Sequence, residues 1–495
     1  MTTIHMRRHG RLTPLRRYGA GVLLGSGIFL CLNLFSLNGT PFLLGGDEQV
    51  FWMNAQRLLH GELIYRDFFE FTPPGTDLVY LSAFGLLGSR IWVPNVVVLV
   101  LGIALCWLCF HISRFVMKPA QAAVAAALFL VLDYGAWLDA THHWFSLLAV
   151  MGALAVLPKA RSPARILISG ALLGLASFFT QTRGVSAALG VAGFLLWDRF
   201  ETQEPWRNCL ERQLQLLLSF VVTWGILSSY FIVKVGIWKL LYFQTSYVMR
   251  YVTGEWDDLH RAELNVHAWP DHHVLVYVAV PLIYAISLWR WRKAPKETAV
   301  VDGNRVVLLA FVGVAMYLEM AQKPGWLRVD AVAIPSIVLS VWLVAGLAKR
   351  LRNYATTMIW IGLIGLSVHR IWYRNDLRTT VEDLPGGRIA ATQLAGEKLA
   401  WIARHTTPGQ FFFQASYQSV YLPLALRIPV FTFLDRQTRP DFVELDMRQL
   451  EAKRVQYILW SPLDLPRFPE FERYLAYQYQ RVWKFPDQDE IWERK

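Results

Sequence analysis

Two adjacent carboxylates, Asp47 and Glu48, follow the first long apolar segment and are the residues best suited to chemistry. Ionisable side chains at the edge of a membrane span are costly unless they serve a site. A carboxylate placed there can act as a general base that takes a proton from a hydroxyl group. Asp47 also precedes a stretch of helical spacing, where an aspartate often caps the helix by accepting bonds from free backbone N–H groups. The sequence leaves both roles open.

The stretch after the carboxylates predicts an amphipathic helix. Phe51, Ala55 and Leu58 recur at helical spacing, which is typical of a helix lying on a membrane interface. The segment Pro73-Pro74-Gly75 then ends any helix and turns the chain. The following apolar run, Leu78–Leu87, is too short to span a bilayer, so we expect it to lie in the interface as well.

The composition indicates a membrane protein that must hold these residues at one face. The chain has 495 residues, of which 54% are hydrophobic and only 17% charged. Its apolar residues form long blocks near the length that crosses a bilayer core. These blocks predict about eleven transmembrane helices, at roughly 17–37, 91–111, 120–138, 143–157, 165–181, 184–198, 213–234, 273–290, 305–322, 329–348 and 355–372.

The distribution of Lys and Arg predicts which side each loop faces. The formal charge of +12 comes largely from short loops between apolar blocks, in alternate loops, which argues against nucleic acid as a partner. By the positive-inside rule the N-terminus is cytoplasmic, and an odd number of spans puts the C-terminal region outside. We therefore expect a multi-pass protein of the cytoplasmic (inner) membrane. The predicted outer loops lie at about 38–90, 139–143, 181–184, 235–272 and 323–328.

The first outer loop carries a resemblance to a known family. Asp47-Glu48, then Tyr65-Arg66-Asp67-Phe68-Phe69, then Pro73-Pro74-Gly75, resemble this loop in GT-C fold glycosyltransferases. The nearest group is the bacterial relatives of protein O-mannosyltransferases and of the lipid A aminoarabinose transferase (glycosyltransferase family 39/83-like). The likeness covers the membrane part, roughly residues 17–372.

The resemblance implies a reaction and a role for Asp47. The donor would be a polyprenyl-phosphate sugar, and transfer would invert the anomeric carbon by direct displacement, with Asp47 as the base. Glu48, Arg66 and Asp67 would orient Asp47, shift its pKa or bind substrate.

The resemblance also implies a second acidic point in the second outer loop, which here reads Asp139-Ala140-Thr141-His142-His143. We expect Asp139 to take part in the site. One hypothesis is a divalent cation, Mg²⁺ or Mn²⁺, with Asp47, Asp139 and His142 as ligands. The alternative is that Asp139 and the histidines cap helix ends and face the interface.

Three basic residues on the base-poor outer side are candidates for binding the phosphate of the donor. Arg183 lies between two apolar blocks, while Lys323 and Arg328 flank Pro324-Gly325-Trp326. Arginine offers bidentate contacts to phosphate and lysine a point charge. The loop of Lys323 and Arg328 resembles the phosphate-binding loop of these transferases, although it lacks the His or Tyr often seen there. The alternative is that these side chains extend to lipid headgroups.

A histidine-rich stretch between His260 and His273 also lies in an outer loop. Its histidines and Asp271 could bind a metal, but their spacing matches no standard zinc motif. This stretch is left without a function.

Residues from about 373 to 495 differ in character and predict a second domain. Short apolar runs of strand length alternate with helical stretches, which indicates a small α/β domain on the outer side. The domains are thus 1–372, with the first outer loop, and 373–495. The predicted helices are Ala390–His405 and Phe442–Arg454, and the predicted strands Gln410–Ala415, Val455–Trp460, Gln480–Phe485 and Glu490–Glu493.

The sequence therefore predicts a mainly α polytopic membrane protein of the GT-C fold with an α/β C-terminal domain. The leading hypothesis is a glycosyltransferase that moves a hexosyl or pentosyl group to a hydroxyl of a glycolipid, polysaccharide or protein. The first alternative is a transporter or flippase of lipid-linked glycans, although such proteins usually place ionisable groups near the bilayer midplane on broken, repeated helices. The second is a non-catalytic subunit of an envelope-assembly complex.

Overall fold

The computed structural model describes residues 14–157, 162–249, 272–293, 303–321, 325–416, 419–435, 438–463 and 468–495. Lys323, His260, His267 and Asp271 lie outside these residues, so the phosphate-binding role of Lys323 stays a prediction. Of His272 and His273 only the helical backbone is described.

Every apolar block of the sequence is helical in the structure. Five of these helices in the described residues are long and apolar enough to cross a membrane, so the protein is a multi-pass membrane protein, while the count of eleven spans stays a prediction. The helices are α1 Pro14–Leu34, α4 Trp92–Ser113, α5 Pro119–Leu128, α7 His142–Val156, α8 Pro163–Phe179, α9 Gln181–Thr202, α10 Trp206–Val235, α13 His272–Lys293, α15 Gly303–Ala321, α17 Ile334–Ala345 and α18 Lys349–Leu377.

Two of the predicted blocks are not single helices. The block at 120–138 continues from α5 into a π-helix, η1 Phe129–Tyr134, and a short α6 Gly135–Trp137. The block at 329–348 is divided into α16 Trp326–Asp330 and α17, whose first turn contains Pro335. Proline is favoured in a first turn because its missing N–H would have no helical partner there. This division places α16 as a separate short helix at the end of the bundle.

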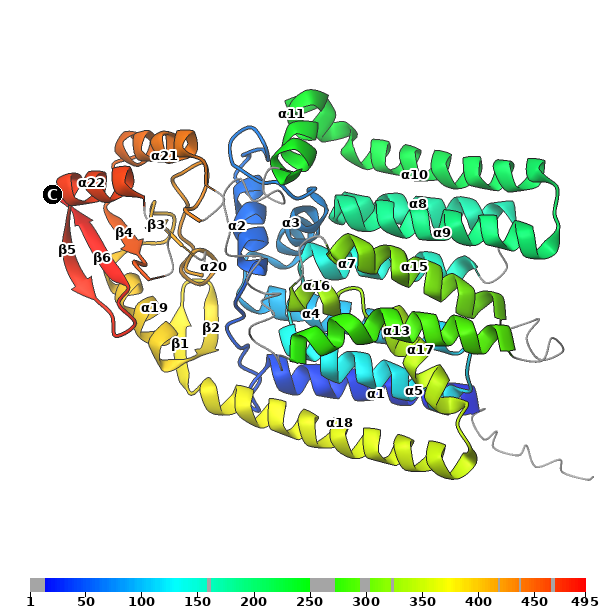
Figure 1. The fold of residues 1–495 in the computed structure, drawn as a ribbon. Coiled ribbons are helices and arrows are strands. Elements are labelled where there is room, and N and C mark those ends of the chain that lie inside the picture. Colours follow the sequence, from blue (N-terminus) through cyan, green and yellow to red (C-terminus); the bar gives the residue numbers. More distant parts are fainter. Residues whose placement is uncertain are drawn as a thin grey trace, which may run out of the picture.

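The long helices run side by side, and the C-terminal region lies beyond one end of the bundle (Figure 1). Between the two lie α2 Glu48–Leu59 and α3 Gly75–Leu87, which cross the direction of the long helices. The N-terminal end of α1 is at the opposite end of the bundle. The structure thus separates the N-terminal end of α1 from the C-terminal region, as the loop charges predict, and the orientation in the membrane remains a prediction.

The helix α2 is more deeply buried than the predicted interfacial helix would be. Phe51 and Trp52 pack into the core of the long helices, while Met53 belongs to the core of the C-terminal region. The predicted helix is confirmed, but it packs between two cores instead of lying open on a membrane surface. The start of α3 is fixed as closely, because a Cβ at Gly75 would lie 2.6 Å from the carbonyl oxygen of Phe178.

The C-terminal region contains a two-stranded antiparallel sheet, β1 and β2, and a four-stranded sheet of order β3-β4-β6-β5. Strands β3 and β4 pair in parallel, and the other neighbours are antiparallel. The elements after α18 are β1 Thr380–Leu384, β2 Gly387–Ala391, α19 Gln393–His405, β3 Phe413–Gln414, α20 Tyr421–Leu424, α21 Pro440–Ala452, β4 Tyr457–Trp460, α22 Pro469–Gln478, β5 Tyr479–Lys484 and β6 Glu490–Arg494.

The two strands predicted near the end of the chain are confirmed as β5 and β6, which pair with each other as a hairpin. Two predictions were wrong in detail. Ala390 lies in β2 and α19 begins only at Gln393, and of Gln410–Ala415 only two residues form a strand. Because α18 continues to Leu377, a helix crosses the predicted boundary at 372, and the division into two domains stays a prediction.

Candidate active site

The two carboxylates of the first outer loop lie at the start of α2 and face different surroundings. A positive φ of 107° at Gly46 turns the chain into the helix. Glu48 is fully buried, and its Oε2 accepts a hydrogen bond of 3.0 Å from the backbone N–H of Ala140. Asp47 is exposed and occupies the N-cap position, but its side chain makes no capping hydrogen bond. The side chain of Asp47 therefore does not cap α2 in this structure.

Asp139 comes to the same place from the turn between α6 and α7. The turn depends on Leu138, a buried residue with a φ of 51° in the left-handed region, where a residue other than glycine is uncommon. The carboxylate of Asp139 is 5% exposed and accepts a hydrogen bond from the indole N–H of Trp144. The bond from Ala140 to Glu48 then ties this turn to α2.

The three carboxyl groups share one electrostatic environment. Burial, and then the charge of Asp47, raises the pKa of Asp139 to about 7. Burial, and then the charge of Asp139, raises the pKa of Glu48 well above its usual range. Desolvation by the surrounding protein raises the pKa of Asp47, and the positive charge of Arg328 opposes that rise. Asp47, exposed and beside a cation, is therefore the carboxyl group best placed to ionise and meet a substrate.

Two arginines lie beside the carboxylates. The positive charge of Arg328, on α16, interacts electrostatically with Asp47 and with His142 at the start of α7. Arg374, in the last turn of α18, acts on Glu48. The structure thus brings together Asp47, Glu48, Asp139, His142 and Arg328 as the sequence predicts.

Arg374 is a member of the site that sequence reasoning missed. The sequence does contain a signal, because Arg370, Arg374 and Arg378 recur every fourth residue and so share one face of α18. A basic face at the predicted outer end of the last apolar block indicates an anionic partner.

The helix α16, which carries Arg328, is held by two contacts. Trp137 donates a hydrogen bond of 2.7 Å from its indole nitrogen to Oδ2 of Asp330. Arg183 donates a bond of 2.8 Å to the carbonyl oxygen of Ala331, just after α16. These contacts tie α16 to α6 and to α9.

Arg183, predicted to bind phosphate, is committed to contacts within the protein. Its guanidinium is 1% exposed and forms an ion pair of 3.1 Å with Glu319 of α15. Thr182 donates a second bond to the same carboxylate. Arg183 also lies near the site, because its positive charge interacts electrostatically with His142. Its contacts with Glu319 and Ala331 give it a structural role as well.

Arg66 and Asp67 are not brought to the carboxylates. They form an ion pair of 2.7 Å in which Arg66 is 53% exposed. Arg57, in the last turn of α2, donates a hydrogen bond to the backbone oxygen of Asp67. The pair therefore lies at the far end of α2 from Asp47, about 15 Å along the helix axis at 1.5 Å per residue. Their assignment to substrate remains a prediction that the geometry does not favour.

The predicted metal site is not supported by the arrangement of side chains. Within the described ranges, no group of three or more His, Cys, Asp or Glu side chains is placed to hold a metal ion. The ring of His142 packs against Phe51 and His143. Asp47, Asp139 and His142 thus do not make up a ligand set, and the divalent cation stays a hypothesis from the resemblance.

Comparison with known proteins defines the class of fold. No protein-family model and no curated protein sequence matches the chain. The fold is that of the GT-C membrane glycosyltransferases, as in the solved structures it resembles.

Three of these structures illustrate the likeness. ArnT from Cupriavidus metallidurans bound to undecaprenyl phosphate has a TM-score of 0.65 and 12% identity, over 96% of this chain and 97% of that one. The same protein in the apo state has a TM-score of 0.57 and 13% identity, over 97% and 98%. The apo oligosaccharyltransferase of Archaeoglobus fulgidus has a TM-score of 0.52 and 12% identity, over 90% and 70%.

Proposed function

We propose that this protein is a glycosyltransferase of the cytoplasmic membrane that moves a sugar from a polyprenyl-phosphate donor to an acceptor hydroxyl at the outer face. The observation that carries the proposal is the placement of an exposed Asp47 beside Arg328, backed by two buried carboxyl groups, at the end of the bundle next to the C-terminal region. The GT-C fold supports it, since one similar structure holds undecaprenyl phosphate.

In this mechanism Asp47 is the general base. Its carboxylate takes the proton of the acceptor hydroxyl as the acceptor oxygen attacks the anomeric carbon from the face opposite the phosphate. The bond between that carbon and the phosphate oxygen breaks, and the polyprenyl phosphate leaves with both electrons of the bond. The configuration at the carbon is thereby inverted.

The other charged groups assist from fixed positions. Arg328, and Lys323 by the same prediction, would stabilise the negative charge that develops on the leaving phosphate. Burial, and then the nearby charge of Asp47, raises the pKa of Asp139, so Asp139 is a protonated neighbour of the base below about pH 7. Glu48 acts as a positioning residue, because it binds the backbone N–H next to Asp139.

A groove beside the site suits a lipid-linked substrate. It has a volume of about 840 Å³ and runs between α9 and α15, next to η3 Tyr242–Tyr247. Val185, Leu189, Phe311 and Leu318 give it apolar walls, while Thr182 and Glu319 line its polar end. An isoprenoid chain fits such walls, since its burial needs no polar partner. We assign the groove to the tail of the donor or of a lipid acceptor.

The test is sugar transfer by the purified full chain, offered labelled polyprenyl-phosphate sugars and a membrane extract as the source of acceptor. We expect Asp47→Asn to lose at least about a hundredfold in rate, the lower range for a positioned general base. The matched control is Asp383→Asn, since Asp383 is 83% exposed on β1. Equal transfer by Asp47→Asn and wild type would contradict the assignment of Asp47. Movement of an intact lipid-linked glycan without a new glycosidic bond would favour the transporter instead.

A further inference from the structure

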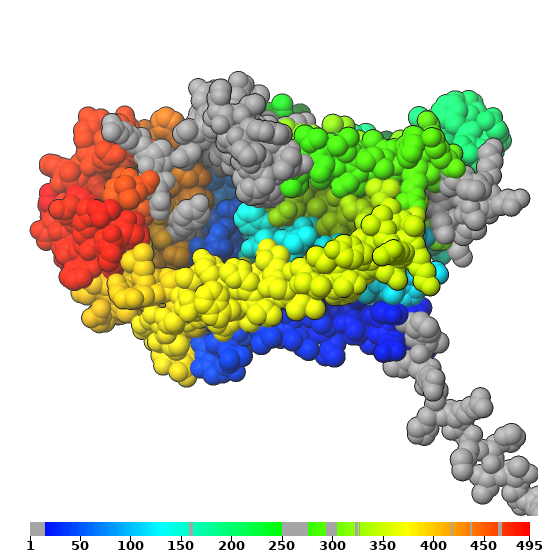
Figure 2. Space-filling view, turned by 60° about the horizontal axis from the view of Figure 1, so that its bottom comes forward, coloured from blue at the N-terminus to red at the C-terminus, as the bar shows by residue number. Residues whose placement is uncertain are grey.

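A second large groove lies at the other end of the bundle, far from the carboxylates. It has a volume of about 900 Å³ and runs between α1, α5 and α18. Figure 2 shows α1 and α18 side by side along this face. All residues of α18 are described, and of these only Leu363 is buried, so this helix packs thinly against the bundle. The space beneath it is wide enough to hold another molecule.

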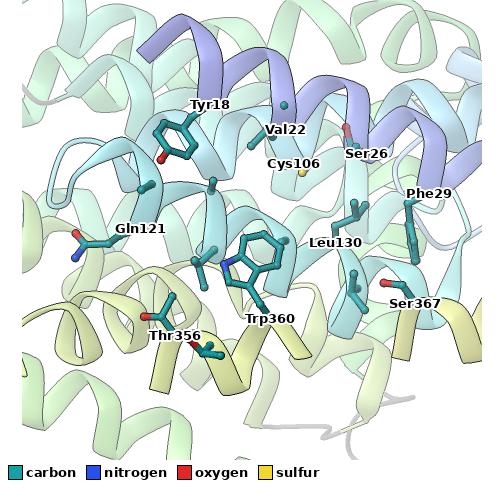
Figure 3. Close-up of a pocket in the computed structure, with 18 of the residues that line it drawn as sticks. Tyr18, Val22, Ser26, Phe29, Cys106, Gln121, Leu130, Thr356, Trp360 and Ser367 are labelled. Atoms are coloured by element: carbon teal, nitrogen blue, oxygen red, sulfur yellow. The ribbon is translucent and has the colours of Figure 1, made fainter. Parts of the chain in front are cut away.

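The walls of this groove change from polar to apolar along its length. Figure 3 shows Tyr18, Gln121 and Thr356 at one end, and Phe29 and Leu130 toward the other. At the polar end α1, α5 and α18 all begin, and a helix start carries a partial positive charge.

Two arginines complete the polar end. Arg17 lies in the first turn of α1 and Arg352 in the first turn of α18, and both line the groove. From Arg17 to Phe29 the helix α1 rises about 18 Å. One leaflet of the bilayer core is about 15 Å thick, so the groove spans a leaflet from headgroup level to the midplane.

We propose that this groove binds an anionic phospholipid of the leaflet at the N-terminal end of α1. The phosphate lies between Arg17 and Arg352, and one acyl chain extends between α1 and α18 past Trp360. The charge of the polar end and the apolar length match the two parts of such a lipid. Two guanidinium groups on different helices can grip one phosphate, as arginine does in bidentate contacts. The lipid thereby holds α18, which carries Arg374, against the bundle.

The experiment measures lipid retention by native mass spectrometry and the thermal unfolding midpoint of the purified full chain in detergent. The probes are phosphatidylglycerol and phosphatidylcholine with the same acyl chains, and inorganic phosphate. We expect phosphatidylglycerol to stay bound and to raise the midpoint. Arg17→Gln and Arg352→Gln should each weaken its binding on the order of tenfold, the scale of one charge-assisted hydrogen bond.

The matched controls are Arg16→Gln and Arg350→Gln, which remove neighbouring exposed charges that do not line the groove. Equal losses in the control and test variants would overturn the proposal, because they would indicate attraction to a basic surface. Equal effects of phosphatidylcholine, or of inorganic phosphate alone, would overturn it as well. A third variant, Val22→Trp, fills the apolar part, and it should weaken phosphatidylglycerol binding while leaving both arginines in place.

Discussion

Replacing Asp139 with asparagine should stabilise the protein increasingly as pH rises. Asp139 is buried near Asp47, and its pKa is raised from 3.8 to about 7. In the unfolded chain it ionises near pH 4, whereas in the fold it keeps its proton up to about pH 7. Folding is therefore penalised above pH 4, and the penalty grows until pH 7 and then stays constant. The asparagine has no such penalty, and its carbonyl oxygen can still accept the hydrogen bond from Trp144.

The size of the effect follows from the pKa shift. A rise of about three units corresponds to about 4 kcal/mol at pH 8, with each unit worth about 1.4 kcal/mol. At pH 5 the same shift contributes less than half of that, because the pH is only about one unit above the pKa of the unfolded chain. These are upper values, since the three carboxyl groups titrate together and the loss of one charge also eases ionisation of Glu48.

The assay is the thermal unfolding midpoint of Asp139→Asn and wild type in one detergent at pH 5, 6, 7 and 8. We expect the variant to unfold at a higher temperature at pH 8, by on the order of a few degrees, with a smaller gain at pH 5. Asp383→Asn, on the exposed strand β1, controls for a change of net charge. A gain that does not depend on pH, or a loss at pH 8, would refute the reasoning.

Three further predictions follow from the same contacts. Arg328→Gln should raise the pKa of Asp47, so the acidic limb of the transfer rate moves to higher pH in a rate–pH profile. Gly75→Ala should destabilise the fold by about 2 kcal/mol or more in thermal unfolding, since its Cβ would overlap a backbone oxygen, whereas Gly85→Ala, with open space, should not. Arg183→Ala should cost about 3–5 kcal/mol because it leaves a partly buried carboxylate on α15 unpaired, and its unfolding midpoint should fall accordingly.

The sequence predicts the helices well because each apolar block must satisfy its backbone hydrogen bonds internally in a bilayer. It predicts the meeting of Asp47 with Asp139 for a related reason. Both residues lie in predicted outer loops on the same side, and the resemblance to GT-C transferases implies that the second of these loops supplies an acidic residue to the site. The distribution of Lys and Arg among the loops thus predicts which side chains share one side of the membrane, before any tertiary contact is known.

What the sequence could not place depends on packing between distant segments. Arg374 reaches the site only because α18 lies along α1 and continues past the predicted end of its block. Arg66 and Asp67 follow Asp47 closely in the sequence, yet α2 carries them to its other end. The partnership of Arg183 with Glu319 joins two helices separated by more than a hundred residues.

The site is fixed by hydrogen bonds between the segments that carry Asp47, Asp139 and Arg328. The bond from Ala140 to Glu48 joins α2 to the turn of Asp139, and the left-handed Leu138 sets the direction of that turn. The bond from Trp137 to Asp330 joins the same region to α16. In the proposed mechanism, a base and a leaving-group cation held this way need little reorganisation during transfer, which is the condition under which fixed charges stabilise a transition state most effectively. An exposed Asp47 on a rigid support therefore suits catalysis better than a carboxylate on a free loop would.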